Sequence, residues 1–213
     1  NATAPAVPGH NFPARDGFDA YVDWLVAEAS LLPRPVHLVG YSAGGRIVAG
    51  ALAKGVACDA ATLISTNLGL GSPAEREARA LTDARWSALL RERGIDAFVD
   101  AWEAQPLFAS QAAMPETSRA WQRMARTSLD PNALADAMDA LSLARMPDLH
   151  EAMRGVTLPW QVVVGALDAK FIALAHAMSA PGVVELADCG HNPLLEAPEL
   201  LAASLNNFVR GLV

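Results

Sequence analysis

The sequence lacks both the cysteine content and the long apolar runs that mark several large classes of protein. Its two cysteines, Cys58 and Cys189, are too few and too isolated to form a disulfide framework or a metal cluster. No apolar run reaches the roughly 18 residues of a membrane span, and no charged stretch followed by an apolar one marks a secretory signal. We therefore expect a cytoplasmic protein whose two thiols are reduced and buried.

Positive charge is also scarce. The chain has 16 Lys and Arg against 23 Asp and Glu, which gives a formal net charge of −7. Nucleic acids and anionic membranes are bound through basic stripes, and none is visible, so we expect neither as a partner. No His or Cys spacing suggests a zinc site, and we expect no metal and no cofactor. The composition, 52% apolar and 18% charged, is that of a chain with a sizeable core, as a monomer or a small homo-oligomer.

One stretch, V-H-L-V-G-Y-S-A-G-G-R from Val36 to Arg46, has a pattern typical of a catalytic serine. An apolar run of strand length leads into G-x-S-x-G at Gly40, Ser42 and Gly44, and a segment with the small and aliphatic residues of a buried helix follows. A serine on so sharp a strand-to-helix turn is strained, and the strand and helix approach closely enough to require small residues on either side. We expect Gly40 and Gly44 to meet that need. The N–H of Ala43, at the start of the helix, is the expected oxyanion donor.

Short apolar segments and helical segments alternate around this turn. Residues 1–16 lack periodicity and are expected to be coil, whereas residues 17–32 have apolar positions three and four apart, which predicts an amphipathic helix. Alternation of this kind predicts an α/β fold, with a mostly parallel sheet that has helices on both faces. The further strands are expected at 61–65, 160–164 and 183–186, and the further helices at 171–178 and 198–212.

Residues 72–154 have a different pattern. They predict helices only, with breaks near Gly94, Pro106, Pro115 and Pro131. A helical block between two strand signals predicts an insertion that covers the site as a lid. We therefore expect a core made of residues 1–71 and 155–213 and a helical lid made of residues 72–154.

A serine hydroxyl becomes a good base or nucleophile when an imidazole takes its proton and a carboxylate fixes that imidazole. Ser42, Asp168 and His191 occur in the chain order Ser, Asp, His that accompanies this kind of turn. Asp168 follows a strand, where it could instead cap a helix. Asp59 precedes its strand and Asp188 is only three residues from His191, so both fit the triad less well. The other histidines are expected at the surface or in packing: His10, His37, His150 and His176.

With its G-x-S-x-G turn and its Ser, Asp, His order, the sequence resembles the α/β-hydrolase superfamily. It resembles more closely the 2-succinyl-6-hydroxy-2,4-cyclohexadiene-1-carboxylate synthases of menaquinone biosynthesis. The resemblance spans nearly the whole chain, including the helical block. It rests on G-Y-S-A-G-G-R at 40–46, E-R-E-A-R-A-L-T-D-A-R-W at 75–86, A-W-E-A-Q-P-L-F-A-S at 101–110, the segment ending at Arg126, L-D-A-K-F at 167–171 and G-H-N at 190–192.

The resemblance implies a lyase that eliminates pyruvate from an enolpyruvyl cyclohexene with several carboxylates, in a reaction started by proton abstraction. It also implies residues that hold this small anionic substrate: Tyr41, Arg46, Arg79, Trp102, Phe108 and Arg126. From spacing alone, Arg46 lies one helical turn beyond Ser42 and can reach the same pocket, where it could pair with a carboxylate. A solvated helix arginine is the alternative for Arg46, Arg79 and Arg126.

The sequence departs from this family at its front. The family begins with strands and an H-G loop that supplies a second oxyanion N–H, but no strand candidate precedes Val36, and the first residue is Asn1 rather than Met. We expect a fragment or a reduced relative. Two other functions stay open: a carboxylic-ester hydrolase with the same triad, and a non-catalytic binding module on a hydrolase scaffold.

Overall fold

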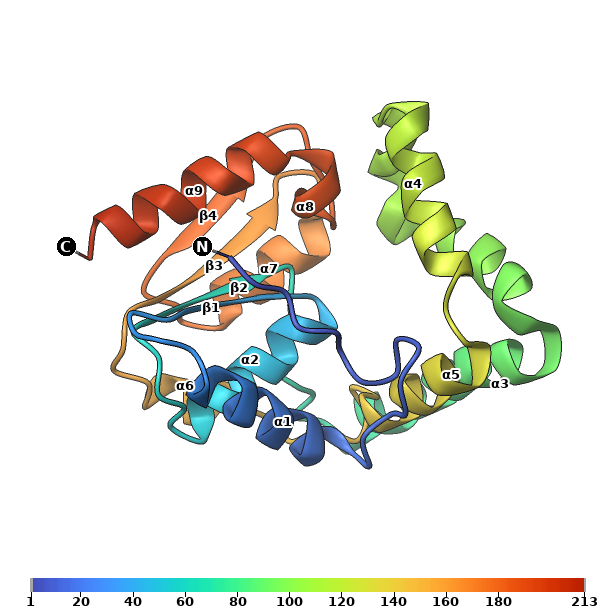
Figure 1. Ribbon diagram of the computed structural model, residues 1–213, viewed down its shortest axis with the longest axis horizontal. Coiled ribbons are helices and arrows are strands. Elements are labelled where there is room, and N and C mark those ends of the chain that lie inside the picture. Colours follow the sequence, from blue (N-terminus) through green and yellow to red (C-terminus); the bar gives the residue numbers. More distant parts are fainter. Residues whose placement is uncertain (1, 213) are drawn as a thin grey trace. The chain divides into compact units, whose positions relative to one another are not determined.

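The computed structural model describes residues 2–212, and a parallel four-stranded sheet is its central feature (Figure 1). The strands are β1 (His37–Tyr41), β2 (Ala60–Ile64), β3 (Trp160–Gly165) and β4 (Val183–Leu186), and they lie side by side in that order. Every residue of β2 and β3 is buried, as expected of the inner strands of a parallel sheet with both faces covered. The prediction of an α/β fold with a parallel sheet is confirmed.

The register of the sheet brings the carboxyl ends of its strands to one edge. Tyr41 pairs with Ile64, Ile64 with Val163, and Gly165 with Leu186. The segments that leave β1, β3 and β4 therefore start beside one another. In open α/β sheets, ligand sites are built at this edge.

Helices pack on both faces of the sheet. Helix α2 (Ala43–Ala53) contacts β1 and β2, and α7 (Ala169–Ala177) contacts β3 and β4. On the other face, α9 (Pro198–Arg210) packs against β4 after the short helix α8 (Pro193–Glu196), as Figure 1 shows. Ile64, Val163 and Leu186 form the core beneath α9 together with Cys189, Ala197 and Leu201.

The described chain divides into two compact units. The unit that holds the sheet comprises residues 25–68, 106–115 and 149–212, and the helical unit comprises residues 2–24, 69–105 and 116–148. The first boundary between the two units along the chain, between Trp24 and Leu25, falls within helix α1 (Phe18–Ser30). The segment 106–115 thus groups with the sheet, although helical segments precede and follow it in the sequence.

Residues 72–154 form only helices in the described structure, as the sequence predicts. These are α3 (Pro73–Glu103), the 3-10 helix η1 (Pro106–Ala113), α4 (Glu116–Thr127), α5 (Pro131–Ala140) and α6 (His150–Arg154). The expected break at Gly94 is a kink inside α3, where the glycine has φ 76°. Within the helical unit, α3 packs on α5 through Leu90, Phe98, Val99 and Ala135. The position of this unit over Ser42 stays a prediction.

None of the helices between residues 2 and 212 combines the length and the apolar character needed to cross a membrane.

Candidate active site

Ser42 lies between the end of β1 and the start of α2 in a strained backbone conformation. Its φ is 49° and its ψ is −111°, a region that residues other than glycine rarely adopt. Two hydrogen bonds fix the turn: the Ser42 N–H donates to the Ile64 carbonyl at 2.8 Å, and the Thr66 hydroxyl donates to the Ser42 carbonyl at 2.7 Å. Ala43 is the first residue of α2, so its N–H belongs to the helix N-terminus beside the serine.

The close approach of β1 and α2 depends on Gly40 and Gly45. A Cβ at Gly40 would lie 2.5 Å from the Gly44 carbonyl oxygen, and one at Gly45 would lie 2.7 Å from the Thr66 Cβ. A Cβ at Gly44 would meet nothing within 4 Å. The expectation that Gly44 is needed for close approach is therefore wrong, because the next residue of the helix, Gly45, is the one that faces the Gly40 carbonyl oxygen and Thr66.

His191 is within hydrogen-bonding reach of both Ser42 and Asp168. Its Nε2 lies 3.4 Å from the Ser42 Oγ, and its Nδ1 lies 2.8 Å from the Asp168 Oδ2. The carboxylate can only accept from Nδ1–H, which leaves Nε2 to accept from the serine hydroxyl. His191 is 2% exposed and Asp168 is 7% exposed, so water competes little for the hydrogen bond between them.

Asp168 combines the two roles that the sequence left open. Its side chain is the N-cap of α7, where Oδ1 accepts from the Phe171 N–H at 3.3 Å, while Oδ2 faces His191. The rival Asp59 instead binds the Val36 N–H at 2.6 Å and Arg34 at 2.5 Å, before β2 begins. The hydrogen bonds from the Val36 N–H and the Arg34 guanidinium lower the pKa of Asp59, which is thus held as a structural carboxylate.

Three aromatic rings surround the His191 imidazole. The ring centroids of Phe171, Tyr41 and Phe108 lie 4.4, 5.5 and 5.9 Å from that of His191. Tyr41 and Phe108 were expected at the site, but Phe171 was not. The signal for Phe171 was its place three residues after Asp168, on the first turn of the helix that Asp168 caps.

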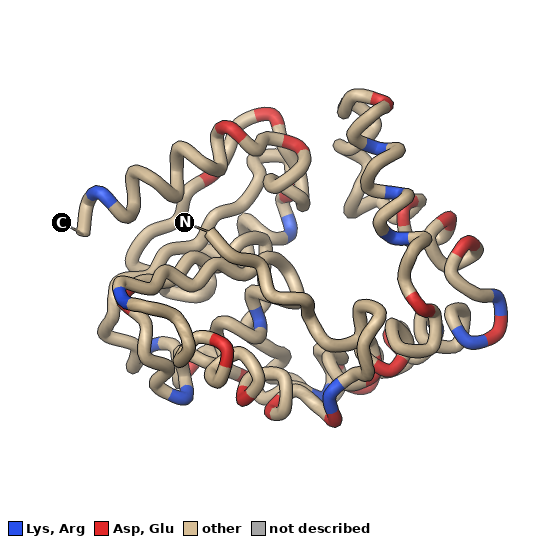
Figure 2. The backbone as a smooth tube through the Cα atoms, in the orientation of Figure 1, with Lys and Arg blue, Asp and Glu red and all other residues tan. Residues whose placement is uncertain are grey.

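The predicted substrate arginines fall into both units. Arg46, in the sheet unit, is half-buried in the first turn of α2. Its backbone N–H donates to the Ser42 carbonyl at 3.2 Å, as in a regular helix. In the helical unit, Arg79 pairs with Asp83 at 2.7 Å and Arg126 with Glu103 at 2.9 Å. Trp102, also in the helical unit, stacks on Phe98 at 5.3 Å between ring centroids. Figure 2 shows acidic and basic residues close together along α3 and α4, in keeping with these pairs.

A small cavity of about 240 Å³ opens beside the His191–Asp168 pair. It is lined by Pro106, Leu107, Ala109, Ser110, Leu167, Asp168, Gly190 and His191. All of these residues belong to the sheet unit, so the segment 106–115 supplies one wall of the site.

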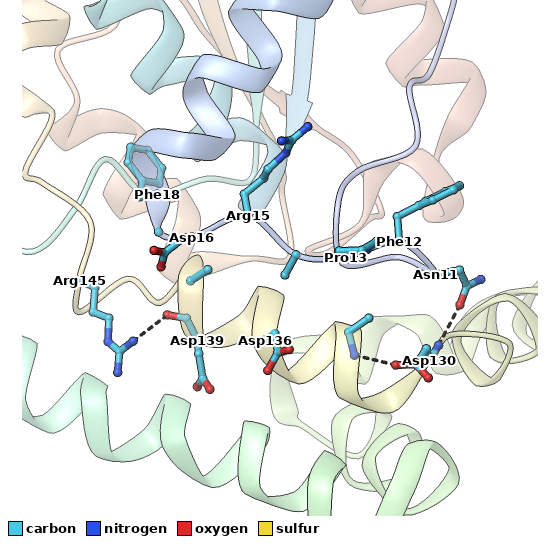
Figure 3. A pocket seen from close by; sticks show the side chains of 14 residues that line it. Asn11, Phe12, Pro13, Arg15, Asp16, Phe18, Asp130, Asp136, Asp139 and Arg145 are labelled. Atoms are coloured by element: carbon cyan, nitrogen blue, oxygen red, sulfur yellow. Dashed lines mark hydrogen bonds between the residues drawn. The ribbon is translucent and has the colours of Figure 1, made fainter.

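A larger cavity of about 800 Å³ lies within the helical unit, between residues 11–18 and helix α5 (Figure 3). Three of its acidic residues have partners: Asp136 and Asp139 pair with Arg91, and Asp130 caps α5 through the Ala133 N–H. None of the described residues that line it belongs to the predicted triad. Among residues 2–212, no group of three or more His, Cys, Asp or Glu side chains is placed to hold a metal ion.

A parallel sheet that presents a serine at a strand-to-helix turn, with an aspartate and a histidine after later strands, defines a protein with the α/β-hydrolase architecture. Comparison with known families agrees with this class. The chain matches the Alpha/beta hydrolase family over residues 1–204 and belongs to that family.

Several curated relatives of this chain are named as synthases. The 2-succinyl-6-hydroxy-2,4-cyclohexadiene-1-carboxylate synthase of Salmonella typhimurium is 32% identical, in an alignment that covers 96% of this chain and 81% of the relative. The solved structure of MenH from S. aureus is 26% identical with a TM-score of 0.92, covering 97% of this chain and 82% of MenH. The solved structure of an esterase from Thermogutta terrifontis shares the fold. It is 24% identical with a TM-score of 0.80, and the comparison covers 98% of this chain and 79% of the esterase.

Proposed function

We propose that this protein is a lyase that eliminates pyruvate from an enolpyruvyl cyclohexene carboxylate, in the manner of a 2-succinyl-6-hydroxy-2,4-cyclohexadiene-1-carboxylate synthase of menaquinone biosynthesis. The observation that carries the proposal is the 32% identity to a synthase across 96% of the chain, which includes the helical residues 72–154 as well as the sheet. The grouping of Ser42, His191 and Asp168 supports it, because an elimination of this kind needs a base.

In the proposed reaction, His191 Nε2 takes the proton of the Ser42 hydroxyl, and the serine oxygen removes a proton from carbon in the substrate. The electron pair of that C–H bond forms a new double bond, the C–O bond to the enolpyruvyl group breaks, and the three-carbon group leaves as the enolate of pyruvate. That enolate takes up the proton held by His191 and becomes pyruvate, so Ser42 and His191 return to their starting protonation. Asp168 stabilises the imidazolium that forms through its bond of 2.8 Å to Nδ1. The Ala43 N–H and the N-terminus of α2 favour the negative charge that develops beside Ser42.

We propose further that residues 72–154 act as a lid on a core made of residues 1–71 and 155–213. Phe108, in η1, supports this role because its ring already lies against His191. Arg79, Trp102 and Arg126 would hold the substrate from the lid side. Since Asp83 and Glu103 now pair with the two arginines, a substrate carboxylate would have to share or replace those partners.

A cytoplasmic location is part of the same proposal. Cys58 and Cys189 are both free and buried, which is the usual state of cysteines in a reducing compartment.

A carboxylic-ester hydrolase is the second candidate, because the His191–Ser42 arrangement would serve an ester equally well. Arg46 separates the two functions. A substrate with several carboxylates loses hydration on entering a closed site and needs positive partners there, whereas a neutral ester needs none. An arginine one helical turn beyond the serine therefore suits the lyase.

The test is to replace Arg46 and measure both activities. Arg46→Ala should cost roughly 2 to 5 kcal/mol in kcat/KM for pyruvate release from the cyclohexene acid, by analogy with a truncated buried charge pair. Hydrolysis of a neutral p-nitrophenyl ester should barely change. Arg34→Ala is the matched control, since Arg34 is an exposed arginine that pairs with Asp59. An equal loss of both activities in Arg46→Ala would show that Arg46 only supports the turn.

A further inference from the structure

The loop that carries His191 is fixed by its backbone on both sides of the histidine. The Gly190 N–H donates to the Glu196 Oε2 at 2.7 Å, and the Asn192 N–H donates to the Glu196 Oε1 at 2.9 Å. One carboxylate, from the last residue of α8, therefore binds the two N–H groups that flank His191. On the preceding side, the Cys189 carbonyl accepts from the Leu167 N–H at 2.9 Å, which joins this loop to the one that carries Asp168.

These bonds to the loop matter because the contact between His191 and Ser42 tolerates little displacement of the loop. The distance of 3.4 Å from Nε2 to the Ser42 Oγ is already at the long end for a hydrogen bond. The bond to Asp168 sets the orientation of the imidazole ring, but it does not fix the backbone from which the ring projects. If the loop moved away by about 1 Å, proton transfer from Ser42 would be lost in most molecules.

Capping of α8 explains only part of this arrangement. Glu196 donates its own N–H to the Asn192 carbonyl at 2.9 Å, and its bond from the Asn192 N–H resembles a helix cap. The bond from Gly190 lies two residues before the cap position and adds nothing to the helix. Gly190 is itself held closely, because a Cβ there would lie 2.1 Å from the Ser110 Oγ. The second bond therefore acts on the histidine loop.

We propose that Glu196 is a positioning residue for catalysis: its carboxylate holds the backbone at Gly190 and Asn192 so that His191 reaches Ser42. The inference rests on the proposed role of His191 as the base that activates Ser42. It does not depend on which substrate the protein uses.

The experiment compares Glu196→Ala and Glu196→Gln with Glu199→Ala as the matched control. Glu199 is an exposed carboxylate in the first turn of the next helix, α9. The alanine variant removes both bonds to the loop, whereas the glutamine variant keeps one acceptor oxygen and turns an NH2 group toward the other N–H. We expect kcat for pyruvate release to fall about 10- to 100-fold in Glu196→Ala and less in Glu196→Gln, with KM within about twofold in both. Glu199→Ala should match the wild type.

A second measurement is independent of the substrate. A fluorophosphonate probe reacts with an activated serine: the Ser42 Oγ bonds to phosphorus, fluoride leaves, and the serine proton passes to His191. The rate of Ser42 labelling should fall in the same order as kcat. Thermal unfolding and circular dichroism should show both Glu196 variants folded at the assay temperature. If the alanine variant does not fold, the glutamine variant decides the question.

The outcomes separate this inference from the proposed function. Absence of pyruvate release by the wild type, together with slower labelling in the folded Glu196 variants, would end the lyase proposal and support the positioning role. Wild-type rates of labelling and turnover in a folded Glu196 variant would overturn the positioning role and leave the lyase proposal intact. If wild-type Ser42 neither labels nor turns over substrate, His191 activates nothing, and the inference fails with the triad.

Discussion

His191 follows Ser42 by 149 residues and Asp168 by 23 residues, yet each of the three lies just past the carboxyl end of a strand. That these three side chains meet could be predicted from the sequence because each leaves a local signature: G-x-S-x-G for the serine, and an aspartate and a histidine each following a strand. Phe171 and Glu196 could not be assigned in the same way. Their contacts are a ring that packs on His191 and a carboxylate that binds backbone N–H groups, and these contacts exist only after the chain folds.

Cys189 provides a prediction at the level of a single residue. Burial, followed by the charges of Glu196 and Asp188, raises the pKa of its thiol from 9.0 to about 11. The folded protein should therefore resist alkylation of Cys189 by iodoacetamide at pH 9, where the same thiol reacts readily in urea. Mass spectrometry of the labelled peptides measures this difference. Fast alkylation of Cys189 in the folded protein would show that the thiol is accessible and ionised.

The same shift has a consequence for stability. Above pH 9 the unfolded chain loses the Cys189 proton while the folded chain keeps it, so the unfolded state binds fewer protons. The thiol's contribution to stability is complete below that pH and is lost as the pH rises toward 11. Cys189→Ala removes this contribution, so its free energy of unfolding should fall less steeply than that of the wild type over the same range.

Among the elements, the strands were predicted best and the shortest helix was missed. The apolar runs at 160–164 and 183–186 predict β3 and β4 to within one residue, because buried parallel strands are continuous hydrophobic runs. Helix α8 has four residues, too few for a helical period to show in the sequence. The sequence predicts the close packing of β1 and α2 and the need for Gly40, but on the helix the glycine that has no room for a Cβ is Gly45 rather than Gly44.

This packing gives a paired prediction. Gly40→Ala should destabilise the protein strongly, because its Cβ would lie 2.5 Å from the Gly44 carbonyl oxygen, and backbone atoms cannot move aside cheaply. Gly44→Ala should be neutral or stabilising by up to about 1 kcal/mol, because alanine favours the helix and its Cβ meets nothing within 4 Å. Urea unfolding of the two variants measures both effects. Equal stability would mean that β1 and α2 are not in close contact.

For the whole molecule, the class of fold was predictable and the division into units was not. A serine at a strand-to-helix turn, a parallel sheet and a block of helices between two strands follow from the order of strand and helix signals. The grouping of residues 106–115 with the sheet does not follow from that order, because it depends on contacts such as that between Phe108 and His191. The sequence pattern shows that this stretch is helical but not which unit it joins.

The central claim is that the protein releases pyruvate from an enolpyruvyl cyclohexene carboxylate with Ser42 as the activated group. The most direct measurement is pyruvate release by the wild type and by Ser42→Ala, with circular dichroism to show that both are folded. The account predicts catalysed release by the wild type and a loss of several orders of magnitude in the variant, of the size seen when a triad member is removed. Release by Ser42→Ala within tenfold of the wild type, or no release by the wild type, would contradict it.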